Sequence, residues 1–436
     1  MRKLWFKHLT VEKMISIELP LSKSQLNRGL IVLAAQGNLK NWLSENPDIT
    51  PKGCRDTRLL IEALLKHIEG EDAADFMDAG TPYRLFTTFA AAQFKRPITL
   101  SGNRSLKSRK ISTLVEALTE MGAKITDPEI EGYPPIFIEA GIQQWTDVRI
   151  SVSVSSQFAS ALLLIAPLFP NTKRITLTEI SHSQSYVDLT IQLLQSLGID
   201  VNSTYGREGR EISIHGSYDK MNAVGRDQLA LEADWSAAAF FFPLLLGLKK
   251  TDTLLLEGLP LNSRQGDRQL ATLGQLLGIE STAHPSGVVI KRVADLQDWQ
   301  QNLGDEMPLV DLQNNPDLVP ALVVGWCILG QSSMIQGIEN LRYKECDRIA
   351  ALQQNLAGLG CTLEQLSDGD ADLWHLNAAH RQFPAALHID TKEDHRMAMA
   401  FSALQPWINT LTFSDTRCVE KSFPNYWEQW KKCTFE

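Results

Sequence analysis

The sequence lacks the features that would place the chain in a membrane or on nucleic acid. Its longest apolar run, Ala237 to Leu248, falls well short of the ~18 residues that a membrane-spanning helix needs. It has no basic tract, and its formal net charge is −9. Because nucleic-acid binding depends on neutralising phosphates with a cluster of cations, we expect no nucleic acid and no membrane among its partners.

The cysteines lack the spacings typical of metal sites and disulfide frameworks. There are six of them, at positions 54, 327, 346, 361, 418 and 433, with no Cys-x-x-Cys pair, which argues against zinc and against a set of disulfides. The first 20 residues also lack an apolar h-region, a cleavage site and the composition of a transit peptide. We therefore expect reduced thiols and a cytoplasmic location.

What the sequence does contain is a recurring pattern in which an apolar helix runs into a glycine and then into a strand. The glycines are Gly122, Gly198, Gly278 and Gly360, which lie 76, 80 and 82 residues apart by subtraction of their numbers. A glycine that adopts the left-handed conformation ends a helix and turns the chain back. The spacing predicts a duplicated unit of about 80 residues, and a chain of 436 residues is long enough for two or three domains.

A second pattern places a polar cluster directly before a helix rich in small apolar residues. Ser or Asp at such a start can cap the helix, and a helix that is apolar all round is buried in its domain. Six such starts could converge on shared sites, because free N–H groups and the helix dipole favour anions; capping alone is the alternative for each. The six segments are residues 22–37, 78–94, 153–168, 232–247, 311–330 and 393–404.

Three clusters in the first half of the chain could bind an anion. Ser155, Ser156 and Gln157 stand in a row before a buried helix, and capping would explain one serine more readily than three polar groups. Arg109 lies in a basic loop, residues 102–110, and could clamp a phosphate or a carboxylate with two hydrogen bonds. Lys23, Ser24 and Arg28 open the first segment. For both basic clusters a solvated surface is the alternative.

Two clusters in the second half carry acidic and basic groups together. Lys344 and Arg348 lie four residues apart, on one helical face, where an anion could offset their repulsion. Asp394, His395 and Arg396 precede a helix with no polar face, which predicts that they lie at the inner end of a buried helix, although His395 could be purely structural. Asp234 and Asp311 precede two further helices as caps, and either could be a general base if it faces a substrate hydroxyl, although capping is favoured for Asp234.

Taken in order, these stretches closely resemble the enolpyruvylshikimate phosphate synthase family (3-phosphoshikimate 1-carboxyvinyltransferase). Eleven motifs occur in the right order between Leu21 and Gln429. They are "LSKSQLNR", "DAGTPYR", "SLKSRKI", "GYPPIFI", "VSVSSQF", "SYVDLT", "EADWSAAA", "DLQNNPD", "NLRYKECDRI", "EDHRMAMAFS" and "EKSFPNYWEQ".

The resemblance implies both a reaction and a fold. The reaction is transfer of the enolpyruvyl group from phosphoenolpyruvate to the 5-hydroxyl of shikimate 3-phosphate, with release of phosphate and with no metal or organic cofactor. The fold is α/β, with two domains of three βαβαββ units each and buried parallel helices. The lower domain would comprise residues 1–20 and 232–436, and the upper domain residues 21–231. The family's usual state is a monomer.

The resemblance also implies roles for particular residues. Asp311 would be the base on the acceptor hydroxyl, Glu345 would exchange a proton with the methylene carbon, and Lys23 would offset charge on phosphate. The residues implied for shikimate 3-phosphate are Lys23, Ser24, Arg28, Ser155, Ser156, Gln157, Ser183, Asp311, Asn340 and Lys344. Those implied for phosphoenolpyruvate are Lys23, Gly80, Arg109, Gln157, Arg348, Arg396 and Lys421.

Three positions depart from the family pattern. Asp78 stands where the family has Asn, so a carboxylate beside an anion site would repel phosphoenolpyruvate unless a neighbour such as Arg109 neutralises it. Leu21 replaces a glycine, and Pro82 stiffens the next helix start. Affinity for phosphoenolpyruvate is therefore less certain than the reaction.

Two other functions stay open from the sequence. One is transfer to UDP-N-acetylglucosamine by the sister family, which carries a reactive loop cysteine, whereas Cys54, the one cysteine before residue 232, lies outside any matching motif. The other is a non-catalytic relative that binds anions. The motif around His395 follows the shikimate branch, and the retained Asp311, Glu345 and Lys23 favour catalysis.

Overall fold

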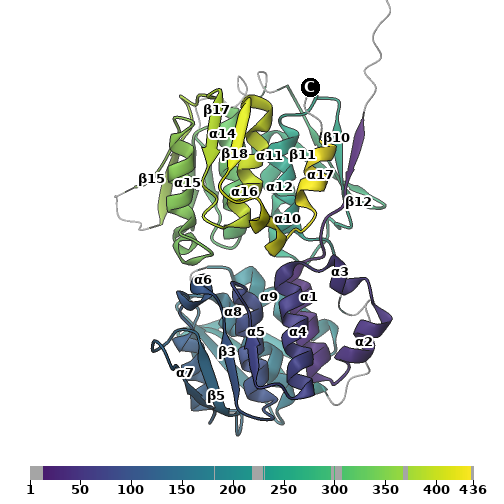
Figure 1. Cartoon of the computed structure of the whole chain (residues 1–436), viewed down its shortest axis with the longest axis vertical. Coiled ribbons are helices and arrows are strands. Elements are labelled where there is room, and N and C mark those ends of the chain that lie inside the picture. The colour runs from purple at the N-terminus through teal and green to yellow at the C-terminus, as the bar shows by residue number, and fades with distance from the viewer. Residues whose placement is uncertain are drawn as a thin grey trace, which may run out of the picture.

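The computed structural model describes residues 13–180, 182–218, 229, 231–295, 299, 307–366 and 372–433. They form two lobes joined at a narrow waist (Figure 1). One hydrophobic core draws on residues between Leu26 and Leu229, and the other joins residues between Ile15 and Leu19 to residues between Ala233 and Cys433. We call these parts the N-lobe and the C-lobe. Because each buries its own apolar side chains, we propose residues 20/21 and 231/232 as domain limits.

The described part of the N-lobe contains two four-stranded sheets with the same order, β2-β3-β5-β4 and β6-β7-β9-β8. In each, the first pair of strands is parallel and the other pairings are antiparallel. The strands are β2 (Ala73–Asp75), β3 (Ile98–Ser101), β4 (Lys124–Thr126), β5 (Ile136–Ala140), β6 (Val148–Ser151), β7 (Lys173–Thr178), β8 (Asp200–Gly206) and β9 (Gly209–His215).

The described part of the C-lobe repeats this arrangement in two sheets of order β1-β10-β12-β11 and β13-β14-β16-β15, and adds a parallel pair, β17-β18. The strand β1 (Met14–Ile17) brings the start of the chain into this lobe. The others are β10 (Thr253–Glu257), β11 (Ile279–His284), β12 (Gly287–Arg292), β13 (Leu309–Asp311), β14 (Ser333–Gln336), β15 (Thr362–Gln365), β16 (Leu373–Asn377), β17 (Ala386–Ile389) and β18 (Thr410–Phe413).

The helices predicted from the six apolar segments are all present and buried. They are α1 (Lys23–Ala35), α5 (Gly80–Ala92), α8 (Ser156–Ile165), the pair α10 (Trp235–Ala238) and α11 (Phe241–Leu245), α14 (Val319–Leu329) and α16 (His395–Phe401). Every residue of α14 and of α16 is buried. The other helices and turns are α2 (Leu39–Glu45), α3 (Ile49–Lys52), α4 (Arg55–Glu69), α6 (Arg104–Lys107), α7 (Ser112–Glu120), α9 (Gln184–Ser196), α12 (Leu270–Leu273), α15 (Arg348–Ala357), α17 (Tyr426–Lys432) and the 3-10 turns η6 (Glu339–Tyr343) and η8 (Arg417–Lys421).

The repeated α/β unit is confirmed, and four of its copies have the full set of strands. Gly122, Gly198, Gly278 and Gly360 all have positive φ, as the helix-to-strand turns require. Residues 21–70, all described, form helices and no strand beyond an isolated bridge. The physical reason is local: residues 38–54 carry Pro47, Pro51 and Gly53 and no alternating run of β-branched side chains.

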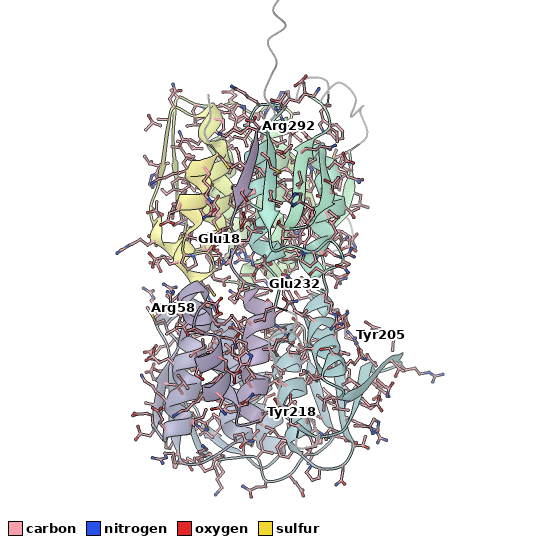
Figure 2. The ribbon with its side chains drawn as sticks, turned by 90° about the vertical axis from the view of Figure 1, so that its right-hand side faces the viewer. Glu18, Arg58, Tyr205, Tyr218, Glu232 and Arg292 are labelled. Atoms are coloured by element: carbon pink, nitrogen blue, oxygen red, sulfur yellow. The ribbon has the colours of Figure 1, made fainter. Side chains whose placement is uncertain are left out.

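Two segments cross the waist side by side. Leu21 forms the isolated bridge with Ala233, the amide of Ser22 donates to the carbonyl of Glu232 at 2.8 Å, and the amide of Asp234 donates to the carbonyl of Pro20 at 2.9 Å. Glu232 lies at this crossing (Figure 2). The crossing places the starts of α1 and α10 next to each other, between the lobes. Among the described residues, no helix has both the length and the apolar character to cross a membrane.

Candidate active site

A cavity between the lobes is lined by residues from both. It collects the N-terminal ends of α1, α5, α8 and α16, together with the turn η6 and the loop before α14. Of the residues implied by the resemblance, those that line it are Lys23, Ser24, Arg28, Gly80, Arg109, Ser155, Ser156, Gln157, Ser183, Asn340, Lys344, Glu345, Arg348 and Arg396. Their roles stay predictions, but the fold brings them to one place.

On the N-lobe side, α1 supplies two cations. The Lys23 ammonium lies 3.1 Å from a carboxylate oxygen of Asp56. Burial alone would lower the pKa of Lys23, but Asp56 raises that pKa above its ordinary value. Arg28 lies one turn deeper, is 2% exposed and donates to the hydroxyls of Thr190 and Ser160 at 2.7 and 3.0 Å. Burial lowers the pKa of Arg28 to about 10, so it stays charged at neutral pH.

The start of α8 presents hydroxyl and amide groups. Ser155 is the N-cap, and its hydroxyl accepts from the amide of Gln157. The side-chain oxygen of Gln157 in turn accepts from Arg84 Nη1 at 2.7 Å. The side-chain NH₂ group of Gln157 therefore remains to donate to a ligand. Burial, and then the nearby charge of Arg109, lower the pKa of Arg84 to about 10.

Arg109 lies against the start of α5. A Cβ atom on Gly80 would lie 2.8 Å from Arg109 Nη1, so the absence of a side chain at Gly80 leaves room for the guanidinium. Arg109 Nη2 donates to the hydroxyl of Ser105 at 3.2 Å, while its Nε has no hydrogen-bond partner within the described residues. Pro82 lies in the first turn of α5, where its missing N–H costs no helical hydrogen bond.

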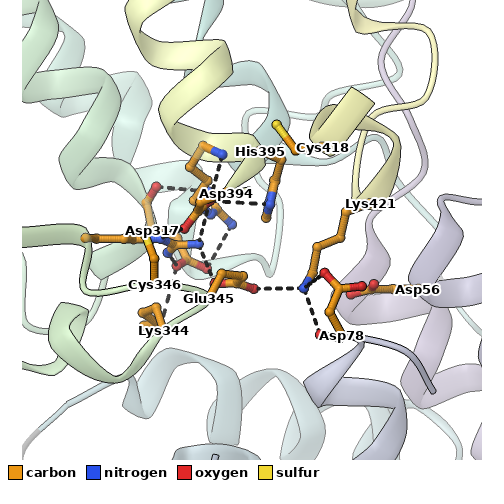
Figure 3. Close-up of polar contacts among 12 residues, drawn as sticks. Asp56, Asp78, Asp317, Lys344, Glu345, Cys346, Asp394, His395, Cys418 and Lys421 are labelled. Carbon is orange, nitrogen blue, oxygen red and sulfur yellow. Dashed lines mark hydrogen bonds and ion pairs between the residues drawn. The ribbon is translucent and has the colours of Figure 1, made fainter. Parts of the chain in front are cut away.

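On the C-lobe side, Arg348 is held by three carboxylates. Its Nε donates to Asp394 at 2.7 Å, its Nη1 to Asp317 at 3.0 Å and its Nη2 to Glu345 at 2.6 Å (Figure 3). Asp394 is fully buried and also caps α16 by accepting from the amide of Arg396. A guanidinium with five donors can satisfy three carboxylates at once.

Asp317 connects the two lobes. Its carboxylate accepts from Arg396 Nη2 and from the hydroxyl of Tyr186, an N-lobe residue, both at 2.9 Å. Lys344 Nζ lies 3.8 Å away. Burial alone would raise the pKa of Asp317, but Arg396, Lys344 and Arg348 hold it well below its usual range. Asp317 is therefore an ionised carboxylate inside the cavity.

Glu345 faces the other end of this cluster. Its carboxylate contacts Arg348 at 2.6 Å and Lys421 Nζ at 3.5 Å. Burial alone would raise the pKa of Glu345, but these cations, followed by Arg109, hold it well below its usual range.

His395 lines the cavity as a neutral ring. It is 1% exposed, and burial followed by the charge of Arg396 lowers its pKa well below the ordinary value. Within the described residues, neither ring nitrogen makes a hydrogen bond, and Asn340 Oδ1 is also without one. Buried polar atoms without a partner are costly, so these atoms are suited to a polar ligand.

Asp311 lies away from the other predicted site residues, and its role as a base stays a prediction. It ends β13, is exposed, accepts from the amide of Gln313 and does not line the cavity; nor does it cap α14, which begins at Val319. The strand carries Asp311 to the rim, and the turn that follows brings Asp317 inward six residues later. Asp317 is therefore the carboxylate of this segment that meets the other cavity residues.

Lys421 differs from the sequence-based prediction in a second way. Its side chain is 1% exposed and does not line the cavity. Its ammonium lies 2.9 Å from both the backbone oxygen and a carboxylate oxygen of Asp78 (Figure 3). Asp78 is also 2.6 Å from Arg55. The sequence suggested Arg109 as its neutralising neighbour, whereas Arg55 and Lys421 fill that role because α4 and η8 flank the loop before α5.

Several cavity residues were not singled out from the sequence. Arg84, Asp56, Tyr186 and Asp317 line the cavity, and each is paired with a residue far from it in the chain. Three of them lie inside motifs that the sequence analysis identified, and this was the available signal: Arg84 in "DAGTPYR", Tyr186 in "SYVDLT" and Asp317 in "DLQNNPD". Asp56 lies on α4, whose sequence reads as an ordinary amphipathic helix.

Comparisons with known proteins agree with this arrangement. The profile of the family described as EPSP synthase (3-phosphoshikimate 1-carboxyvinyltransferase) matches residues 53–430. A 3-phosphoshikimate 1-carboxyvinyltransferase from Bacteroides fragilis is 32% identical over 422 residues, which cover 96% of this chain and 95% of that protein. The protein of the same name from Methanoregula boonei is 30% identical over 441 residues, which cover 95% of this chain and 96% of that protein.

Solved structures share the fold. EPSP synthase from Acinetobacter baumannii superposes with a TM-score of 0.66 at 20% identity, over 97% of this chain and 96% of that one. The enolpyruvyl transferase NikO from Streptomyces tendae gives 0.65 at 11% identity, over 96% and 94%. The profile match and the near full-length relatives go further than the fold: this chain belongs to the EPSP synthase (3-phosphoshikimate 1-carboxyvinyltransferase) family.

Proposed function

We propose that this chain transfers the enolpyruvyl group of phosphoenolpyruvate to the 5-hydroxyl of shikimate 3-phosphate and releases phosphate. The observation that supports this most directly is the cavity between the lobes, where cations from both lobes surround Asp317 and Glu345. The two substrates bring two phosphates and two carboxylates, which match such a set of cations. The acceptor hydroxyl and the donor methylene each need a group that moves a proton, and the two carboxylates can serve.

We place the acceptor phosphate against the N-lobe wall. The start of α8 offers Ser155, Ser156 and backbone N–H groups, and Lys23 and Arg28 lie on the neighbouring α1. Helix starts with hydroxyls and free amides suit phosphate oxygens. Ser183, Asn340 and Lys344 complete the proposed acceptor set. Gly80, Arg109, Gln157, Arg348 and Arg396 remain the proposed donor set, with Lys421 behind them.

We assign the base on the acceptor hydroxyl to Asp317 in place of Asp311. The acceptor oxygen attacks C2 of the donor as its proton passes to Asp317, and Glu345, protonated, delivers a proton to the methylene carbon. Phosphate then leaves as the new methyl group returns a proton to Glu345, which restores the double bond, and the proton held by Asp317 departs with the phosphate. Lys23 would offset charge on the phosphate. The reaction as written needs no metal or organic cofactor.

The substrates themselves would prepare the carboxylates. In the structure Asp317 and Glu345 are ionised counter-ions of Arg348, Arg396 and Lys421. Substrate anions that engage these cations remove part of the attraction that holds the two pKa values low. The pKa of Asp317 and of Glu345 would then rise, which makes Asp317 a stronger base and lets Glu345 carry a proton.

The decisive experiment is phosphate release by the purified chain with phosphoenolpyruvate and either shikimate 3-phosphate or UDP-N-acetylglucosamine. We expect release with the shikimate acceptor alone. Release with the sugar nucleotide would move the chain to the sister activity, and release with neither, together with binding seen by calorimetry, would make it an anion-binding protein. The monomeric state and the cytoplasmic location stay predictions; sedimentation of the full chain would test the former.

A further inference from the structure

Asp78 occupies Lys421, a cation predicted to contact the phosphoenolpyruvate donor. A lysine ammonium has three N–H donors, and Lys421 meets three oxygen acceptors: the Asp78 backbone oxygen and carboxylate at 2.9 Å each, and the Glu345 carboxylate at 3.5 Å. Asp78 therefore takes two of the three donors by hydrogen bonds, and the Glu345 carboxylate attracts the ammonium as an ion pair. A ligand that uses Lys421 must compete with both carboxylates.

The position of Asp78 makes it the carboxylate to displace. Glu345 is held at 2.6 Å by Arg348 on its own lobe. Asp78 belongs to the N-lobe, in the loop before α5, and reaches Lys421 of the C-lobe across the waist (Figure 3). Arg55, 2.6 Å from its other carboxylate oxygen, can keep Asp78 paired once Lys421 is released. Asp78 can thus contact both Arg55 and Lys421, or Arg55 alone when a ligand engages Lys421.

The groups around this contact keep Asp78 charged. Arg55 on α4 and Lys421 on η8 both contact it, and Glu345 is the carboxylate that shares Lys421. Burial alone would raise the pKa of Asp78, but Lys421 and then Arg55 lower it below its ordinary value. Over the neutral range Asp78 is therefore an anion that competes with any anion seeking Lys421.

We propose that Asp78 is a specificity-determining residue that keeps free phosphate out of the donor subsite by occupying Lys421. Inorganic phosphate offers one anionic group to that subsite, so its contact with Lys421 alone must offset the cost of displacing Asp78. A donor that carries both a phosphate and a carboxylate also engages Arg348 and Arg396, and these contacts offset the displacement. The subsite then discriminates against inorganic phosphate in two ways: Asp78 competes with it for Lys421, and the attractive contacts to Arg348 and Arg396 favour the donor. After the reaction, Asp78 can contact Lys421 again, and this contact favours departure of the product phosphate.

This inference rests on the proposed function only where it places Lys421 with the donor set, and its test needs no turnover. Inorganic phosphate is titrated into the full chain by calorimetry for the wild type, for Asp78→Asn, for Asp78→Glu and for Asp75→Asn. Asn keeps the size of Asp78 and removes its charge, while Glu keeps the charge. Asp75 is exposed on β2, three residues away, with its side chain accepting from the amide of Met77, so Asp75→Asn measures the general effect of one lost negative charge.

We expect Asp78→Asn to bind inorganic phosphate ~10-fold more tightly than the wild type, because one buried competing charge is removed. Asp75→Asn and Asp78→Glu should stay within about twofold of the wild type. Equal affinities for Asp78→Asn and Asp75→Asn, or weaker phosphate binding by Asp78→Asn, would overturn the proposal. Circular dichroism and thermal unfolding confirm that each variant is folded. If enolpyruvyl transfer itself fails in the separate assay, the phosphate comparison still gives its own answer.

Discussion

The two walls of the cavity differ in the kind of group they present. The N-lobe wall offers cations and hydroxyls, among them Arg28, Arg84 and the serines before α8, with Asp56 paired to Lys23. The C-lobe wall offers carboxylates and cations in direct contact, centred on Asp317, Glu345 and Arg348. The first wall can bind an anion without changing its own protonation, while the second holds groups whose pKa depends on which partner is nearby. We therefore expect both walls to bind the substrates and only the C-lobe wall to transfer protons.

The largest expected effect comes from removing a carboxylate of the C-lobe wall. Asp317→Asn should lower kcat by about 10²–10⁴-fold, the usual contribution of a general base, while calorimetry still detects binding of both substrates. Asp311→Asn is the matched control, six residues earlier on the rim, and should keep kcat within about threefold. If Asp311→Asn loses turnover and Asp317→Asn retains it, the base is Asp311 and the assignment made from the cavity is wrong.

A smaller and different effect is expected on the N-lobe wall. Ser156→Ala removes one hydroxyl from the proposed phosphate site and should raise KM for shikimate 3-phosphate by about 5–30-fold, because one hydrogen bond to a charged group contributes about 1–2 kcal/mol. kcat should change by less than about threefold. Ser108→Ala, an exposed serine of the same lobe, serves as the control. If Ser156→Ala lowers kcat alone, the N-lobe wall also takes part in proton transfer, and proton transfer is not confined to the C-lobe wall.

The smallest effect concerns Asp267, a buried carboxylate for which the described residues supply no ion pair. Asp267 is 4% exposed and its partners are the hydroxyl of Ser236 and the amide of Asn315. Burial, and then the charge of Asp317, raise its pKa to about 6. A raised pKa stabilises the fold below the unfolded pKa of about 4, and this stabilisation is lost as the pH rises through about 6.

Asp267→Asn should therefore lose less stability than the wild type between pH 4.5 and pH 8. The expected difference between the two proteins is on the order of 2 kcal/mol, a few degrees in Tm. Thermal unfolding at both pH values measures it, with the exposed Asp295→Asn as the control. If the two pH dependences coincide, Asp267 is ionised at neutral pH as readily as Asp317, and a nearby cation is not what distinguishes the two carboxylates.

The sequence alone determined the repeated units, the six buried helices and most of the cavity residues. This was possible because glycine in a left-handed turn, a polar helix start and an all-apolar helix are local features, which neighbouring residues dictate. The order of the motifs then implied which helix starts meet. Residues such as Ser155, Ser156 and Arg396 were found because they stand directly at those starts.

Only the tertiary structure decided how the charges pair. Asp311 and Asp317 stand in the same short motif, and the direction of the chain after β13 determines which of them reaches the cavity. The contact of Asp78 with Lys421 joins residues 343 positions apart, and Tyr186 meets Asp317 across the waist. Electrostatic interactions depend on distance and burial, which come from packing between distant segments, so no local pattern contains them.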